Sequence, residues 1–67
     1  MKIGDIATMK DIPVSEFLGL DEQIKEDYDI HFGEIGVINW VDEDLARIGY
    51  VREAVEIPTY LIEVLPE

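Results

Sequence analysis

The chain's one histidine and two groups of carboxylates are the residues whose types could do chemistry. Asp27, Asp29 and His31 alternate along the chain, so in an extended segment they would share one face and could hold a divalent metal ion. A second group of oxygen ligands lies at 42–44. Neither group has the glycine and the closing bidentate glutamate that a helix-flanked calcium loop needs. We therefore interpret both groups as solvated charge, and expect no metal and no cofactor.

Two glycines in the stretch GEIGVINW raise the possibility of a phosphate-binding loop. Such a loop continues with a lysine and a hydroxyl residue and leads into a helix. Gly33 and Gly36 instead lead into a β-rich run that ends near Trp40. We expect Gly33 to supply a turn with positive φ and Gly36 to permit a tight bend of the strand.

Covalent and acid–base catalysis find little support in the sequence. The chain has no cysteine, and no nucleophile motif surrounds Ser15 or His31. A domain of 67 residues also has little room for the deep pocket that tunes a catalytic carboxyl group. We predict that the protein is not an enzyme and has no catalytic residues.

Charge is the strongest compositional signal. Sixteen acidic residues stand against five basic ones, which gives a net charge of -11. The hydrophobic fraction of 48% is nevertheless ordinary for a folded domain. Such a charge disfavours direct contact with nucleic acid or an anionic membrane, and it speeds the encounter with basic protein surfaces.

Length and residue types indicate a single small domain. We expect one domain over 1–67, held together by its core, because a chain without cysteine has no disulfide to help it. No apolar run is long enough to span a membrane, and the amino terminus lacks the apolar segment of a secretory signal. The expected location is the cytoplasm, including that of a host cell if the gene is viral.

Apolar periodicity and turn residues predict about five short strands. We expect them near 2–10, 34–41, 46–53, 55–57 and 61–65, with an interruption at 58–60. In the long first connection, Asp21 is placed to cap a short helix over about 21–27, and a separate turn could form at 15–18. The expected core is Ile3, Ile6, Ile35, Val37, Ile48, Val51, Ile57, Leu61 and Val64.

The second and third of these strands predict an antiparallel hairpin. Trp40 would then face Arg47, a cation–π contact worth about 0.5 to 1 kcal/mol. The same register pairs Val41 with Ala46, Asn39 with Ile48, Ile38 with Gly49 and Val37 with Tyr50.

Several short motifs together resemble those of a known fold. They are the Gly4-Asp5 pair after the first residues, the stretch from Gly33 to Ile38, and the closing segment IPTYLIEVL. This combination is similar to small SH3-like β-barrels of the bacterial and phage KOW-like type, in which a 3₁₀ turn joins the last two strands. The resemblance implies an all-β fold, a small barrel with a short helix or 3₁₀ turn in its long first loop. It does not imply the ligands, because the aromatic pair of peptide-binding SH3 domains and the basic surface of RNA-binding KOW domains are missing.

Trp40 has two interpretations. Large side chains fill the interior of small β domains, and we favour packing in the core or at its rim. The alternative is an exposed anchor surrounded by acids, which would suit a basic protein surface.

These observations favour a non-enzymatic acidic protein-binding module, a regulator or inhibitor that docks on a basic, nucleic-acid-handling surface of a larger protein. Phages and mobile elements encode proteins of this kind, and some act as DNA mimics. The alternative is a structural or accessory subunit that uses the barrel as a packing module. The candidate partner-binding residues are Asp21, Glu22, Glu26, Asp27 and Asp29 in the long loop, Trp40, and Asp42, Glu43 and Asp44 at the hairpin tip.

Uniform like charge should weaken the fold at low ionic strength. Raising NaCl from about 20 mM to about 200 mM shortens the Debye length and should raise the Tm measured by circular dichroism. A fall in Tm would show instead that specific ion pairs outweigh the general repulsion.

Overall fold

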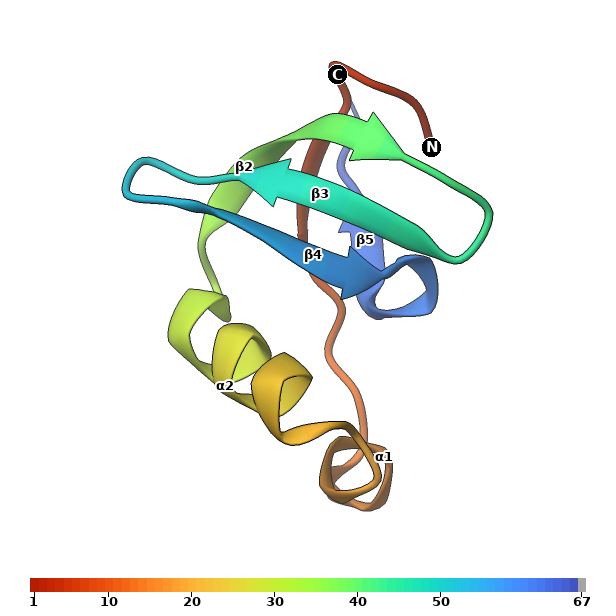
Figure 1. Ribbon diagram of the computed structural model, residues 1–67, viewed down its shortest axis with the longest axis vertical. Coiled ribbons are helices and arrows are strands. Elements are labelled where there is room, and N and C mark those ends of the chain that lie inside the picture. The colour runs from red at the N-terminus through yellow and green to blue at the C-terminus, as the bar shows by residue number, and fades with distance from the viewer. Residues whose placement is uncertain (67) are drawn as a thin grey trace.

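The computed structural model describes residues 1–66, and the protein is mainly β (Figure 1). Five strands, two helices and one 3₁₀ turn make up this part of the chain. In order they are β1 (Ile6–Met9), α1 (Val14–Leu18), α2 (Glu22–His31), β2 (Ile35–Val41), β3 (Leu45–Gly49), β4 (Ala54–Pro58), the 3₁₀ turn η1 (Thr59–Leu61) and β5 (Ile62–Val64).

The strands form one antiparallel sheet in the order β4-β3-β2-β1-β5. Strands β2, β3 and β4 follow one another as hairpins, and η1 turns the chain so that β5 pairs with β1. Over residues 1–66 the sheet is not closed as a barrel, and its order is compatible with an SH3-like fold. Both helices lie on one side of the curled sheet, below it in Figure 1.

The β2–β3 hairpin contains an irregularity that the sequence did not reveal. The predicted pairs Val41 with Ala46 and Trp40 with Arg47 are confirmed. Beyond Trp40 the predicted register is wrong by one residue, because a β-bulge at Asn39 adds a residue to β2. The observed pairs there are Ile38 with Ile48 and Val37 with Gly49.

The core lies between the inner face of the sheet and the helices. Its buried members are Ala7, Met9, Tyr28, Ile38, Ala46, Ile48, Val55, Ile57, Leu61 and Ile62. The expected burial of Ile48, Ile57 and Leu61 is confirmed, whereas Ile3, Ile6, Ile35, Val37, Val51 and Val64 are exposed. In β1 and β2 both faces carry apolar residues, so alternation alone could not identify the face that the helices cover.

The helices are more extensive than the sequence predicted. The separate turn expected at 15–18 forms as α1, and α2 continues beyond the expected 21–27 to His31. Asp21 occupies the N-cap position, but its side chain makes no capping hydrogen bond. Tyr28 of α2 reaches the core, and its hydroxyl donates a hydrogen bond to the Lys10 carbonyl oxygen (2.6 Å).

The two glycines of GEIGVINW have different roles: the positive φ predicted for Gly33 is confirmed, whereas Gly36 lies where two strands approach closely. Gly33 follows α2 with φ of 87°, a conformation that side chains disfavour. Gly36 is buried where β2 crosses close to the end of β3. A Cβ atom at Gly36 would lie 2.9 Å from the Gly49 carbonyl oxygen and 3.0 Å from Cδ1 of Tyr50, and would also collide with the Ile48 side chain.

Replacing Gly36 should therefore destabilise the fold through steric overlap with backbone as well as side chains. We expect Gly36→Ala to lower the free energy of unfolding in urea by about 1–3 kcal/mol. Gly19→Ala is the matched control, because a Cβ there meets backbone oxygens only at 3.5 and 3.9 Å. Equal stability of the two variants would show that the strands can separate at Gly36 without cost.

Candidate protein-interaction sites

The hairpin of β2 and β3 brings part of the predicted site together. Trp40 lies on the outer face of the sheet with 38% of its surface exposed. It is therefore not part of the buried core, which leaves rim packing or an exposed anchor as its role. The Arg47 guanidinium carbon lies 5.8 Å from the centroid of the Trp40 ring. Nη2 of Arg47 also lies 3.7 Å from Oε2 of Glu56 on β4. Arg47 thus holds the indole against the sheet on one side and leaves its remaining surface open.

Apolar residues continue this exposed surface toward the edge of the sheet. Leu45 is two residues before Arg47 on β3, is 40% exposed, and pairs with Pro58 of β4. Strand geometry places Leu45 and Arg47 on the same face. We use the name Trp40 patch for Trp40, Leu45 and Pro58 together with the acidic tip of the hairpin at 42–44.

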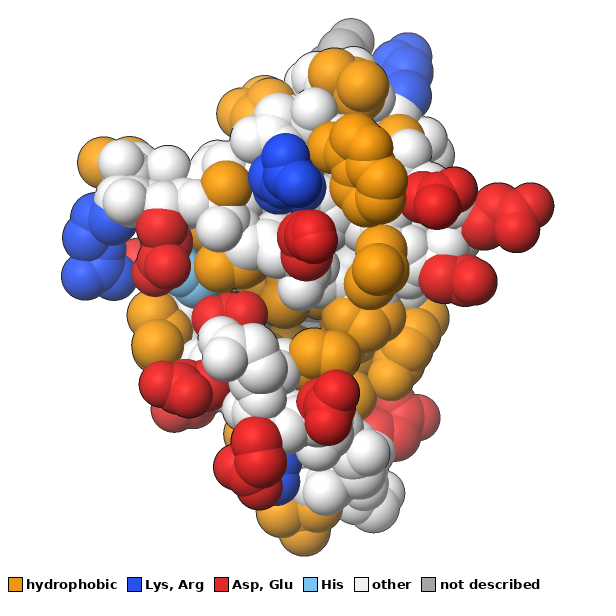
Figure 2. All heavy atoms as spheres, in the orientation of Figure 1, with side chains coloured by type: hydrophobic (Ala, Val, Ile, Leu, Met, Phe, Trp, Pro, Cys, Tyr) orange, Lys and Arg blue, Asp and Glu red, His pale blue; other side chains and the backbone are white. Residues whose placement is uncertain are grey.

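The acidic tip has an ordered backbone. The Asp42 side chain accepts a hydrogen bond from the Glu43 amide (2.8 Å), and the Asp42 amide donates to the Leu45 carbonyl oxygen (2.8 Å). The Thr59 amide of η1 donates to the Asp44 carbonyl oxygen (2.9 Å), which ties the tip to the far end of β4. Figure 2 shows acidic side chains gathered at this end of the hairpin, beside an apolar strip that runs down the same face.

The remaining predicted residues lie on and before α2, away from the Trp40 patch (Figure 1). Glu22, Glu26 and Asp29 are exposed, and their spacing places them on one side of the helix. Glu22 approaches Lys25 at 3.3 Å, and Asp27 accepts from the Gln23 amide group at 3.4 Å. The acidic residues predicted in the long loop and those predicted at the hairpin tip therefore form two separate surfaces.

Asp27, Asp29 and His31 do not share one face, as they would in an extended segment. The segment is helical, and residues two apart on a helix point in different directions. Within residues 1–66, no three histidine or acidic side chains gather in a way that could hold a metal ion.

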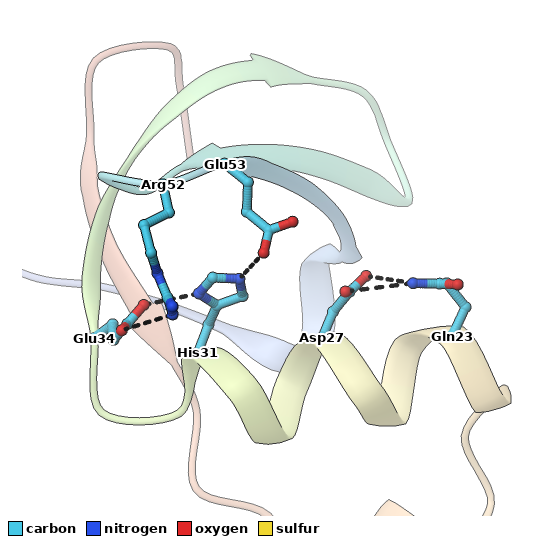
Figure 3. Close-up of polar contacts among 6 residues, drawn as sticks. All are labelled: Gln23, Asp27, His31, Glu34, Arg52 and Glu53. Carbon is cyan, nitrogen blue, oxygen red and sulfur yellow. Dashed lines mark hydrogen bonds and ion pairs between the residues drawn. The ribbon is translucent and has the colours of Figure 1, made fainter.

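The buried His31 is instead the centre of a polar cluster that the sequence analysis did not anticipate (Figure 3). Its ring has no exposed surface; Nδ1 lies 2.7 Å from Oε1 of Glu34, and Nε2 lies 3.2 Å from Oε2 of Glu53. Because ionised carboxylates only accept hydrogen bonds, both contacts form together when the ring carries two protons. Nη2 of Arg52 lies 3.9 Å from the other oxygen of Glu34. The cluster joins the end of α2 to the loop between β3 and β4.

Tyr50 closes this cluster from the sheet side. Its ring stacks on His31 with centroids 4.1 Å apart and planes 3° from parallel. The Tyr50 hydroxyl is buried and has no hydrogen-bond partner among the described residues. Burial, and then the negative charge of Glu34, raise the pKa of Tyr50 to about 12. We interpret these contacts as a structural connection between α2 and the sheet, because the His31 ring is closed off from solvent.

A shallow groove is the second feature that the sequence analysis missed. It has a volume of about 380 Å³ and lies between the connection that follows β1 and the end of α2. Its lining residues are Asp11, Ile12, Val14, Phe17, Tyr28, Asp29 and Phe32. If the helix had been predicted to continue to His31, the groove could have been anticipated. Tyr28 and Phe32 are four residues apart, so they would then lie on one side of that helix.

Comparison of the chain with protein-family models, with curated proteins and with solved structures finds no match. Over residues 1–66, no helix is long and apolar enough to cross a membrane. The function of the chain therefore has to be argued from its own surface.

The buried Tyr50 hydroxyl predicts alkaline instability. The pKa of Tyr50 is about 10 in the unfolded chain and about 12 in the folded protein, so the folded state favours the protonated hydroxyl. This contribution to the free energy of unfolding is fully present below about pH 10 and is lost as the pH rises toward about 12. Tyr50→Phe should remove this loss, and at pH 8 it should be as stable as the parent or more stable by about 1 kcal/mol. The measurement is urea unfolding at several pH values between 8 and 12.

The exposed Tyr60 supplies a matched control for that experiment. Tyr60→Phe keeps the buried hydroxyl and should lose stability with pH as the parent does. An identical alkaline loss in the parent and in Tyr50→Phe would contradict the assignment to Tyr50.

Proposed function

We propose that the chain is a non-enzymatic acidic binding module that docks on a basic surface of a larger protein. The observation that carries the proposal is the Trp40 patch, where an exposed indole lies beside the acids at 42–44. Exposed aromatic residues supply most of the binding energy in many interfaces, and surrounding charges set the choice of partner. The paired strands and the bond from Thr59 hold both parts in place before binding.

The charge of the chain supports a partner that handles nucleic acid. A net charge of -11 on 67 residues is suited to a groove built for phosphates, where it would exclude the natural ligand. The mechanism proposed is steric and electrostatic occlusion by a regulator or inhibitor that acts as a DNA mimic, of the kind that phages and mobile elements encode. We place this activity in the cytoplasm, consistent with a chain that has no cysteine.

We also propose that the fold is an SH3-like barrel of the KOW-like type. The strand order and the 3₁₀ turn between β4 and β5 support this assignment.

An accessory subunit is the second candidate, and the outer face of the sheet favours it. Ile6 of β1 pairs directly with Val37 of β2, and the next residue along that face of β2 is Ile35. These side chains are 44%, 46% and 61% exposed, and the helices lie on the other side of the sheet. An apolar surface of this kind is typical of a face that packs in a larger assembly.

Salt and two matched variants distinguish these candidates. The immobilised protein is used to capture partners from a lysate of the cells that encode it, at about 50 mM and about 300 mM NaCl. A docking module should lose its partner at high salt, and DNA should compete for that partner. Retention at high salt, with no competition by DNA, would favour the accessory subunit instead.

The variants then locate the interface on the captured partner. Trp40→Ala should weaken its binding by about 2 kcal/mol or more, while Val37→Thr on the outer face should leave it unchanged. Because Trp40 is partly exposed, its truncation should cost less stability than the roughly 3–5 kcal/mol typical of a core tryptophan. The opposite pattern, with Val37→Thr releasing the partner and Trp40→Ala retaining it, would overturn the docking proposal.

A further inference from the structure

The groove beside α2 has the composition of a second binding site. Its lining residues come from the segment after β1, from α1 and from the last turn of α2. The helices lie below the sheet in Figure 1, apart from the β2–β3 hairpin. A volume of about 380 Å³ is at the lower end of the range for sites that hold organic groups, and it suits a few side chains of a partner.

Three aromatic residues, Phe17, Tyr28 and Phe32, line this groove with neighbouring rings. The centroids of Phe17 and Tyr28 are 5.7 Å apart, and those of Tyr28 and Phe32 are 5.4 Å apart. The hydrogen bond from Tyr28 to the Lys10 carbonyl oxygen fixes the central ring. This apolar surface is therefore formed before any partner arrives.

The rim of the groove remains open to solvent. Phe32 is 50% exposed and Val14 is 72% exposed, and both line the groove. Exposing these two side chains beside a preformed concave surface has an energetic cost that burial by a partner would remove.

The charge on the groove identifies the chemistry of that partner. Asp11 and Asp29 are its charged lining residues, and both are acidic. Asp29 continues the acidic side of α2 that includes Glu22 and Glu26. A second copy of this chain would bring another charge of -11 to the contact, so self-association is disfavoured. The complement is a segment that carries apolar side chains flanked by lysine or arginine.

We propose that this groove binds a basic amphipathic helix of a partner protein. Apolar side chains of that helix enter between Phe17, Tyr28 and Phe32, and its flanking basic residues meet Asp11 and Asp29. Helices commonly bind in this way, with anchors three and four residues apart placed in an apolar groove. The proposal rests on the proposed function only in assigning the chain to protein binding, because its residues are separate from the Trp40 patch.

The test uses a fluorescein-labelled Leu/Lys amphipathic peptide of about five helical turns, roughly 18 residues. Fluorescence anisotropy gives its Kd for the whole chain. The parent should bind it, and Phe32→Ser and the double variant Asp11→Asn/Asp29→Asn should each weaken binding by about tenfold. A peptide with serine in place of leucine, or glutamate in place of lysine, should bind at least about tenfold more weakly.

A matched charge change separates the groove from the general acidity of the chain. Asp42→Asn/Asp44→Asn removes the same two charges at the hairpin tip and should change the Kd by less than about twofold. Trp40→Ala should also retain the peptide, so loss of the Trp40 function and loss of the groove function are distinguishable. Equal weakening by the two double variants would show nonspecific charge attraction and overturn the proposal.

Amide chemical shifts of the ¹⁵N-labelled protein locate the bound peptide independently of the variants. Peptide addition should shift the amides of Phe17, Tyr28 and Phe32 and leave those of β3 in place. Val14→Ser, at a more exposed position, is the second variant if Phe32→Ser melts early, and it should also weaken binding. Shifts centred on the hairpin, or full affinity in both serine variants, would contradict this site.

Discussion

The buried ring of His31 is the contact on which the arrangement of helix and sheet depends. It ends α2, stacks on Tyr50 after β3, and meets carboxylates that come just before β2 and β4. The ring is fully buried, whereas the side chains of Glu34 and Glu53 are 44% and 51% exposed. Losing either carboxylate would leave a buried ring nitrogen without its partner, which costs more than an exposed pair contributes. The direction of α2, and with it the wall of the groove, is therefore set by polar contacts as well as by the apolar core.

The excess of acid works against this small core. The ion pairs from Lys25 to Glu22 and from Arg47 to Glu56 have exposed carboxylates, so each adds little to stability. Most acidic residues lie on the surface, and their mutual repulsion favours expansion. A basic partner would relieve that repulsion, so stability and binding are expected to depend on the same charges.

Local signals predicted the strands, the interruption after Pro58 and the positive φ of Gly33, because each depends on backbone preferences of nearby residues. The sequence did not reveal which face of β1 and β2 is buried, since the helices make that choice and both faces are apolar. The bulge at Asn39 likewise arises from the pairing of two strands. His31 and Glu53 are 22 positions apart in the chain, so no local pattern could predict the polar cluster around His31. The groove was not predicted because the expected helix ended at about residue 27, before the last turn of α2 that lines the groove.

The pairing of β1 with β5 brings the two ends of the described chain to one corner of the sheet. The Leu65 amide donates a hydrogen bond to the Ile6 carbonyl oxygen (2.8 Å), so chain entering and chain leaving the sheet are immediate neighbours. Domains with adjacent ends tolerate insertion into a host loop and circular permutation, because a short linker can span them. In this structure the chain enters and leaves the sheet at that shared corner, while the helices lie at the opposite end of the molecule (Figure 1).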